Sequence, residues 1–279
     1  MPPVGFGGMP LSIDGRPSET DGVRVVHAAL DAGVRLLDTA DVYCLSDEDL
    51  GHNERLVARA LAEWKGPRAE VLVATKGGLT RPQGRWERNG RPEHLRRACD
   101  RSLKALGVER IDLYQFHAPD SAVPFDESIG ALAELQRAGK VRWLGLSNVS
   151  VREIDVARRQ IEVVTVQNRL SPFFREALHE SVLAHCTALG IGFLAYSPVG
   201  GGRLNKKLPD HPVVKEVARR HDASPHAVVL AWVLAQAPNV IVIPGARTVA
   251  HALDSVAAGR LSLSDEEMDR LTEAEFDRR

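Results

Sequence analysis

The stretch VLVATK, residues 71–76, is a run of apolar and β-branched residues that ends in a lysine and is followed by two glycines. A run of this length with glycines at its end is typical of a strand that is buried on both faces, as in a parallel sheet covered by helices. Lys76 stands where this strand stops. A charge in that position requires polar partners, because an unpaired charge is costly to bury.

Two other predicted strands also end in polar side chains. Residues 34–37 run into Asp38, and residues 111–116 run into His117. Because neighbouring strands lie about 5 Å apart, we expect Asp38, Lys76 and His117 to form one cluster. Each residue has an ordinary alternative role, as a helix cap, a charge at a rim or a loop histidine. Their joint occurrence at the same end of three successive strands favours a functional site.

The rest of the chain alternates predicted strands and helices. We expect strands near residues 4–9, 34–37, 71–75, 111–116, 141–146, 163–166, 191–195 and 240–243, and helices near 21–30 (capped by Asp21), 53–64, 92–106, 125–138, 151–160, 177–189, 225–236, 250–256 and from 264. This alternation predicts an α/β fold, a (β/α)8 TIM barrel of eight parallel strands with its active site at the C-terminal strand ends. A doubly wound sheet would alternate in the same way. The glycines at positions 5 and 7, however, lack the third glycine and the adjoining helix of a dinucleotide-binding fingerprint.

Composition limits the size of the domain and the class of partner. A length of 279 residues with 44% hydrophobic residues allows a large core, and we expect a single domain that spans residues 1–279. The net charge of −1 gives no large field of one sign, so we expect neither nucleic acid nor a membrane as a partner. A small molecule fits better. These features do not determine the oligomeric state, and a monomer is favoured.

The three cysteines, Cys44, Cys99 and Cys186, are far apart and form no C-x-x-C pair. This pattern argues against a disulfide framework or a zinc site, and we expect reduced thiols and no metal. The first residues, Met1-Pro2-Pro3, carry no basic and apolar targeting segment, and no apolar run is long enough to span a bilayer. The sequence therefore predicts a soluble cytoplasmic protein.

Tyr43 lies in the loop that follows Asp38. A tyrosine has a reference pKa of about 10, and a nearby ammonium lowers it by favouring the phenolate. We expect Lys76 to act in this way on Tyr43, with Asp38 neutralising the lysine. Tyr43 is then a candidate general acid, and His117 a donor that orients a substrate carbonyl.

Seven segments, at familiar separations and in this order, resemble the aldo-keto reductases: LLDTADVY, ATKGG, DLYQFHAP, GLSN, VQN, AYSPVGGG and IPGAR. The resemblance extends from Gly5 to about Ser255. It implies that Asp38, Tyr43, Lys76 and His117 are a catalytic tetrad. It also implies hydride transfer from NAD(P)H to an aldehyde or ketone, with the cofactor bound in a barrel.

The same resemblance implies an NADP(H) site. Ser147, Asn148 and Gln167 would hydrogen-bond the carboxamide, which needs both donors and acceptors, and the flat ring of Tyr196 would stack on the nicotinamide. Glycine N–H groups and Arg203 in the loop after Tyr196 would contact the pyrophosphate. The complete set of implied cofactor-binding residues is Gly8, Met9, Asp38, Ser147, Asn148, Gln167, Tyr196, Ser197, Pro198, Val199, Gly200, Gly201, Arg203, Ile243, Gly245, Arg247, His251 and Ser255.

The chain departs from the family pattern at the two ends of the expected site. Many relatives have a basic residue in place of His251 and an asparagine in place of Ser255, so binding of the 2′-phosphate depends mainly on Arg247 and NADPH is favoured over NADH. Met9 and Ala118 stand where many relatives have tryptophan. Trp86 either replaces part of that aromatic wall or only shields its own loop, and the substrate itself is not predicted.

Two other functions remain open. Lys76 would be a Schiff-base nucleophile in a barrel aldolase, although a neighbouring Asp38 would keep the lysine charged and would leave Asn148, Gln167 and Tyr196 without a role. A non-catalytic subunit would keep the cofactor site as a redox sensor or as part of a channel. An intact tetrad argues against this second alternative without excluding it.

Overall fold

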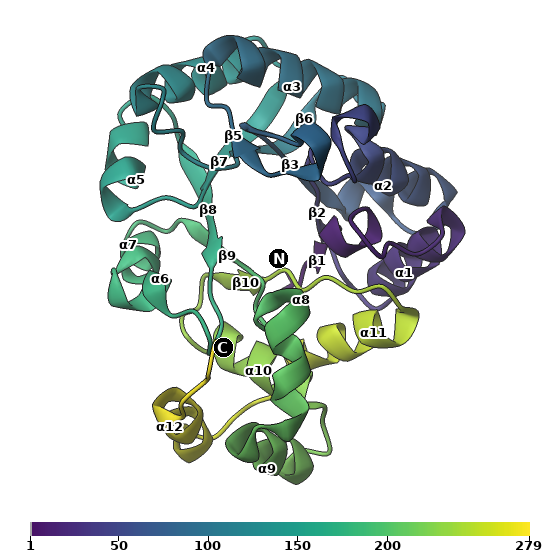
Figure 1. Cartoon of the computed structure of the whole chain (residues 1–279), viewed down its shortest axis with the longest axis vertical. Helices are drawn as coiled ribbons and strands as arrows, with labels where there is room; N and C mark the ends of the chain where they lie inside the picture. The colour runs from purple at the N-terminus through teal and green to yellow at the C-terminus, as the bar shows by residue number, and fades with distance from the viewer. Residues whose placement is uncertain (1) are drawn as a thin grey trace.

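The computed structural model describes residues 2–279 and contains one eight-stranded sheet with the strand order β1-β2-β3-β6-β7-β8-β9-β10. All neighbouring strands pair in parallel. A bridge between Val4 and Val242, with a 2.8 Å hydrogen bond from Gly5 N to Val242 O, joins the two edges. The strands therefore form a ring with the helices outside it (Figure 1). The predicted (β/α)8 barrel is confirmed.

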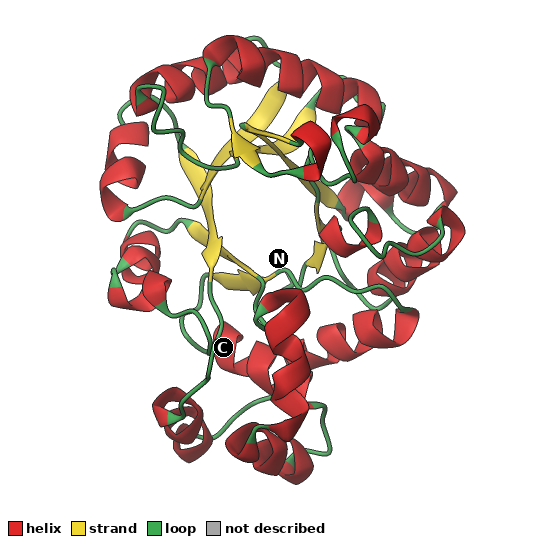
Figure 2. Cartoon of the chain, in the orientation of Figure 1, coloured by secondary structure: helices red, strands yellow, loops and turns green. Residues whose placement is uncertain are grey.

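Figure 2 separates the strands of the ring from the surrounding helices. The barrel strands are β1 (Phe6–Gly7), β2 (Leu36–Asp38), β3 (Leu72–Gly77), β6 (Ile111–Phe116), β7 (Val141–Ser147), β8 (Val163–Arg169), β9 (Gly192–Tyr196) and β10 (Val240–Val242), and a separate antiparallel hairpin consists of β4 (Leu79–Thr80) and β5 (Glu87–Arg88). The helices are α1 (Glu19–Asp31), α2 (His52–Glu63), α3 (Pro92–Leu106), α4 (Phe125–Arg137), α5 (Val151–Ala157), α6 (Glu176–His179), α7 (Val182–Ala188), α8 (Gly201–Leu204), α9 (Pro212–Arg220), α10 (Pro225–Leu234), α11 (Val249–Ala257) and α12 (Asp265–Glu273).

Two local predictions were wrong. Ser18, and not Asp21, caps α1, because the Ser18 hydroxyl accepts a hydrogen bond from Asp21 N at 3.2 Å. The helix expected over 177–189 is divided into α6 and α7 at Ser181, whose φ of 60° is incompatible with a continuous helix. Helices α8 and α9 were not predicted.

Side-chain alternation along the strands decides what faces the inside of the barrel. Leu36 of β2, Ala74 of β3 and Leu113 of β6 pack together in one small apolar cluster. Because side chains alternate between the two faces of a strand, Asp38 and Lys76, each two residues further on, face the same interior. Leu37 of β2 and Thr75 of β3, each one residue earlier, face outward to the helices. The barrel thus brings a carboxylate and an ammonium together above an apolar layer.

Candidate active site

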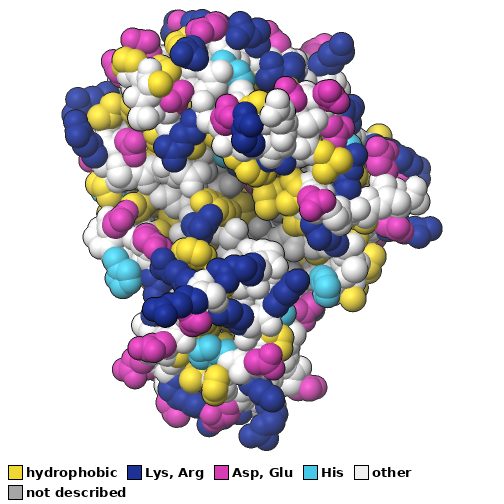
Figure 3. Space-filling model, in the orientation of Figure 1, with side chains coloured by type: hydrophobic (Ala, Val, Ile, Leu, Met, Phe, Trp, Pro, Cys, Tyr) yellow, Lys and Arg dark blue, Asp and Glu magenta, His cyan; other side chains and the backbone are white. Residues whose placement is uncertain are grey.

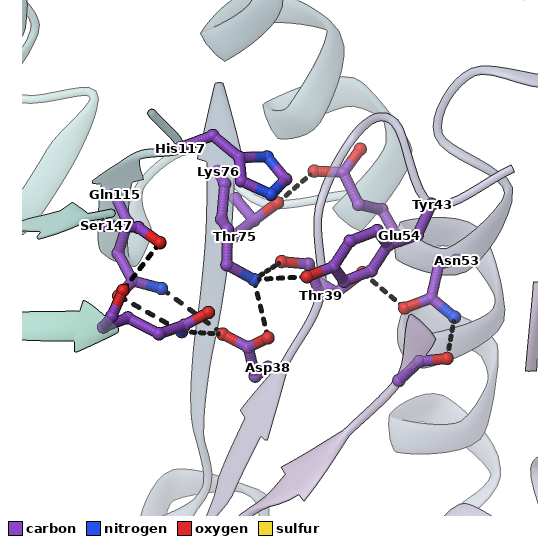
Figure 4. A network of polar contacts seen from close by, with 12 residues as sticks. Asp38, Thr39, Tyr43, Asn53, Glu54, Thr75, Lys76, Gln115, His117 and Ser147 are labelled. Atoms are coloured by element: carbon purple, nitrogen blue, oxygen red, sulfur yellow. Dashed lines mark hydrogen bonds and ion pairs between the residues drawn. The ribbon is translucent and has the colours of Figure 1, made fainter. Parts of the chain in front are cut away.

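Lys76 is the centre of a buried polar network at the C-terminal strand ends (Figure 4). Its side chain is 0% exposed, and its ammonium donates to Asp38 Oδ1 at 2.6 Å, to Thr39 O at 2.9 Å and to Tyr43 OH at 3.0 Å. Burial lowers the pKa of Lys76, but Asp38 and Tyr43 together outweigh burial, so the pKa lies above its usual value. Lys76 is therefore charged, and each of its three protons has an acceptor.

Asp38 has further partners on its second oxygen. Oδ2 accepts from Gln167 Nε2 at 2.7 Å and from Gln115 Nε2 at 3.3 Å. Gln115 was missed in the sequence, although its position two residues after Leu113 on β6 places it on the inner face. Three donors on one buried carboxylate hold it in a single orientation opposite Lys76.

Tyr43 contacts both Lys76 and His117. Its ring and that of His117 meet edge to face, with centroids 5.9 Å apart. Burial raises the pKa of Tyr43 to about 12, although Lys76 acts in the opposite direction. The prediction that Lys76 brings this pKa below its reference value was wrong, because the effect of burial is larger than that of the ammonium and the net shift is upward. The phenol is protonated, which is the state that a proton donor needs.

His117 is also buried beside the network. Burial, assisted by the charge of Lys76, lowers the pKa of His117 well below its usual value, so the ring is neutral at physiological pH. Within residues 2–279, His117 Nδ1 has no hydrogen-bond partner. A neutral imidazole carries one N–H, and an unpartnered Nδ1 is consistent with a proton on Nε2 as the donor.

The residues expected around a nicotinamide lie together on the neighbouring strand ends. Asn148 has a φ of 58°, and its side chain accepts from Tyr196 OH at 2.7 Å and donates to Ser147 Oγ at 3.1 Å. The Ser147 hydroxyl donates to Gln167 O at 2.8 Å. The left-handed backbone of Asn148 turns its amide toward the rim, where Asn148 Nδ2 also reaches His117 O at 2.9 Å.

Glycines shape the backbone on the phosphate side of the expected cofactor site. Gly200 and Gly201 have φ values of 91° and 77° where α8 begins, a conformation that other residues rarely adopt. Arg203 donates to Arg278 O and so is held by the C-terminal segment. Figure 3 shows lysine and arginine side chains gathered along the edge of the central hollow where α8 lies.

The region where adenosine is expected combines the segments that follow β1 and β10. A side chain at Gly245 would place Cβ 2.5 Å from the ring of Pro10, so only glycine fits there. Arg247 donates to Pro10 O at 3.1 Å and to Asp14 O at 2.6 Å. His251, on the first turn of α11, is exposed. The structure brings the predicted Arg247 and His251 to one exposed edge.

The remaining predicted cofactor residues take their positions from the same elements. Gly8 N donates to Asp38 O at 2.8 Å, and Met9 packs beside Tyr43. Ile243 belongs to the inner apolar cluster, and Ser255 lies on α11. The others, Ser197, Pro198 and Val199, form the connection between β9 and α8.

Comparison with known proteins identifies the family. The family model described as Aldo/keto reductase family matches residues 3–275. The chain belongs to the aldo-keto reductase family. It is 33% identical to an aldo-keto reductase of Strobilurus tenacellus over 302 residues, which cover 95% of this chain and 86% of that protein.

Solved structures of other aldo-keto reductases superpose on almost the whole chain. The glycerol dehydrogenase from Gluconobacter oxydans has a TM-score of 0.83 and 31% identity, and the match covers 96% of this chain and 89% of that one. An aldo/keto reductase from Klebsiella pneumoniae, solved in complex with NADP and acetate, has a TM-score of 0.80 and 26% identity over 97% of this chain and 90% of that one.

This aldo-keto reductase has a hairpin loop beside Tyr43. Trp86 meets the Tyr43 ring edge to face with centroids 6.3 Å apart, and the guanidinium carbon of Arg81 lies 3.9 Å from the centroid of the Trp86 ring. Arg81 also donates to Cys44 O at 3.1 and 3.3 Å. Trp86 is 46% exposed. The buried arginine therefore fixes the hairpin, with its exposed tryptophan, against the loop that carries Tyr43.

The described part of this aldo-keto reductase contains neither a metal-ligand cluster nor a membrane-spanning helix. Within residues 2–279, no three His, Cys, Asp or Glu side chains are grouped as metal ligands would be. Across the same residues, the helices are too short or too polar to cross a membrane.

Proposed function

We propose that this aldo-keto reductase transfers a hydride from NADPH to the carbonyl carbon of a small aldehyde or ketone, and that Tyr43 protonates the carbonyl oxygen. One observation carries the proposal. The Tyr43 hydroxyl lies 3.0 Å from a buried, charged Lys76, which is itself 2.6 Å from Asp38. A protonated phenol beside a fixed cation has the arrangement of a general acid whose conjugate base is stabilised.

Each tetrad residue has a separate task. NADPH supplies the hydride when bound. Tyr43 gives its proton to the substrate oxygen as negative charge develops there, and Lys76 stabilises the phenolate that remains. Neutral His117 donates a hydrogen bond that orients the carbonyl, while Asp38 holds Lys76 in place. Burial strengthens these interactions, because it excludes water from between the charges.

The proposed cofactor contacts follow from the donors and acceptors at the rim. Asn148, Ser147 and Gln167 provide both kinds of group for a carboxamide, and Tyr196 provides an aromatic face. The left-handed glycines before Arg203 leave room for a pyrophosphate close to the backbone. The complex of the Klebsiella pneumoniae relative with NADP supports this cofactor.

For the substrate, we propose that Trp86 forms one wall of the pocket. Its ring lies beside Tyr43, and Arg81 holds it there. Because Met9 and Ala118 provide no aromatic wall of their own, an aromatic or planar aldehyde gains most from Trp86.

The structure weighs against the Schiff-base alternative. A nucleophilic lysine must be neutral, whereas Asp38 and Tyr43 keep the pKa of Lys76 above its usual value. The intact Tyr43 and Lys76 pair weighs against a non-catalytic subunit.

Turnover of 4-nitrobenzaldehyde with NADPH, followed by the absorbance of the reduced cofactor, tests the proposal. We expect saturable reduction by the wild-type chain, then a preference within a panel of aldehydes and ketones that includes pyridoxal. Absence of turnover across the panel with bound NADPH would favour the sensing subunit. Trapping of a substrate adduct on Lys76 by borohydride, read by mass spectrometry, would favour the aldolase.

A further inference from the structure

Two buried carboxylates lie on the outer side of β3, opposite the tetrad. Asp41 belongs to the loop that carries Tyr43, and Glu54 belongs to the first turn of α2; they are 1% and 0% exposed. Glu54 Oε1 accepts from Thr75 Oγ1 at 2.6 Å, and Thr75 is the neighbour of Lys76 on β3. The main chain of Asp41 accepts from Gly51 N at 2.7 Å. These contacts tie the Tyr43 loop, α2 and β3 together.

The two carboxyl groups are buried more deeply than the cations near them. The salt bridge of Asp41 Oδ2 is to Arg101 Nη2 of α3, at 3.4 Å, and the Arg101 side chain is 41% exposed. The second cation near Glu54 is Arg55, whose side chain is 54% exposed. Within residues 2–279, Asp41 Oδ1 and Glu54 Oε2 have no hydrogen-bond partner. Two buried negative charges beside partly exposed cations would be unfavourable, and a proton on one carboxyl removes one of these charges.

We propose that Asp41 and Glu54 share one proton, and that this half-neutralised pair positions Tyr43 by holding its loop against β3 and α2. Asp41 and Glu54 are positioning residues in this account, since neither reaches the reacting atoms. The expected effect on the rate rests on the proposed function of Tyr43, whereas the binding of one proton by the pair does not depend on that function.

The electrostatic surroundings agree with one bound proton. Burial raises the pKa of Asp41 to about 8, the charge of Glu54 adds to the rise, and Arg101 opposes it. Burial also raises the pKa of Glu54, against the hydrogen bond from Thr75. The other titratable groups near the pair are Arg55 of α2, Cys99 of α3, Tyr114 of β6 and, in the loop itself, Cys44.

Loss of this proton predicts a specific pH dependence. The folded chain holds the proton on Asp41 more tightly than the unfolded chain, whose aspartate has its ordinary pKa of 3.8. The stability that the proton contributes is complete below about pH 4 and is lost progressively as the pH rises to about 8. Above that pH, two like charges repel behind β3 and loosen the loop that holds Tyr43 OH on Lys76.

The first test is thermal unfolding between pH 5 and pH 9 without substrate or cofactor. Glu54→Gln keeps the acceptor for Thr75 and removes one of the two carboxyl groups, and exposed Glu48→Gln is the matched control. One proton released on unfolding lowers Tm by about 2 to 3 °C per pH unit between pH 5 and 7. We expect this fall in wild type and Glu48→Gln, and a clearly smaller fall in Glu54→Gln. An equal fall of Tm per pH unit in all three proteins would contradict the proposal that Asp41 and Glu54 share one proton.

The second test is the pH profile of kcat/KM for aldehyde reduction with NADPH. We expect Glu54→Gln to stay within about threefold of wild type at pH 7 and to keep its rate to higher pH, where wild type loses activity. Asp41→Asn serves as the second variant if Glu54→Gln folds poorly, and we expect its fall in kcat/KM at high pH to move to higher pH as well. If a folded variant loses kcat/KM at the same pH as wild type, the positioning role is wrong. If the chain reduces no carbonyl, the unfolding slopes still decide whether the proton is shared.

Discussion

The inner and outer faces of β3 contain two polar clusters of opposite character. Inside, Lys76 has three acceptors, and Asp38 accepts from Lys76 and two glutamines. Outside, Asp41 and Glu54 are buried, and the cations near them, Arg101 and Arg55, are partly exposed. In the inner cluster Lys76 is charged and Tyr43 and His117 are neutral, whereas the outer cluster retains one titratable proton. The difference indicates that a change in pH affects this enzyme through the outer cluster.

The two clusters are separated by a single step along the strand. Lys76 faces the barrel interior and Thr75 faces α2, because successive side chains of a strand point to opposite faces. Both clusters are therefore attached to the same short segment of β3. The comparison can be tested by changing matched residues on the two faces.

The largest contrast is expected between two tyrosines. Tyr43→Phe keeps the ring and deletes the acid, so carbonyl reduction should fall by roughly 10²–10⁴-fold. Tyr114→Phe removes an equally buried hydroxyl of the outer face, which has no hydrogen-bond partner within residues 2–279, and should change the rate little. Steady-state kinetics with saturating NADPH measures both. Equal losses would show that burial of a hydroxyl, and not its place beside Lys76, decides the rate.

We also expect Lys76 and Arg101, the cations of the inner and outer clusters, to differ in their contribution to stability. Lys76→Met leaves the buried Asp38 charge without its partner and should lower the free energy of unfolding by about 3–5 kcal/mol. Arg101→Met should cost only about 1 kcal/mol, the range of exposed pairs, because Asp41 then takes up a proton more readily. Urea denaturation at pH 7 gives both values. A larger loss for Arg101→Met would contradict the proposed neutralisation.

Arg247 extends the comparison to a cation that has only carbonyl partners. Within residues 2–279, it forms no salt bridge and is held by Pro10 O and Asp14 O, so its charge is available for the 2′-phosphate. A charge-assisted contact is worth about 1.5–3 kcal/mol, and Arg247→Ala should weaken NADPH binding about ten- to hundredfold. NADH binding should change little. Fluorescence titration checks this, and equal weakening of both cofactors would show that the assignment is wrong.

The smallest effect is expected at Cys44, which follows Tyr43 in the sequence. Burial raises the pKa of this thiol to about 11, and Sγ donates to Val42 O at 3.3 Å. A protonated, buried thiol is unreactive, so Cys44→Ser should keep carbonyl reduction within about threefold of wild type. Complete loss of activity in a folded variant would reveal a role for the thiol in the chemistry.

The sequence predicted the inner cluster better than the outer one. Asp38, Lys76 and His117 stand at strand ends, and the strand order places them together. Gln115 could be inferred from its spacing after Leu113. The direction in which the pKa of Tyr43 shifts could not be inferred, because the depth of burial depends on how all the loops around the site pack.

The outer cluster depends on contacts between elements that sequence patterns do not connect. Glu54 on α2 resembles an ordinary polar residue of a helix start, and its contact with Thr75 depends on how α2 packs against β3. The break at Ser181 is similar, because a helical pattern continues across it and only the backbone shows the positive φ. Position along the strands was predictable, whereas packing and burial were not.

A double-mutant cycle of Tyr43→Phe and Lys76→Met tests the central claim most directly. If Lys76 acts by stabilising the phenolate of Tyr43, removal of the phenol already removes that contribution, and the double mutant should lose about as much kcat/KM as the more severe single mutant. The three variants and wild type are compared with one aldehyde and NADPH at a temperature where circular dichroism shows each to be folded. A loss in the double mutant equal to the product of the single losses would contradict the account, because the two residues would then act independently.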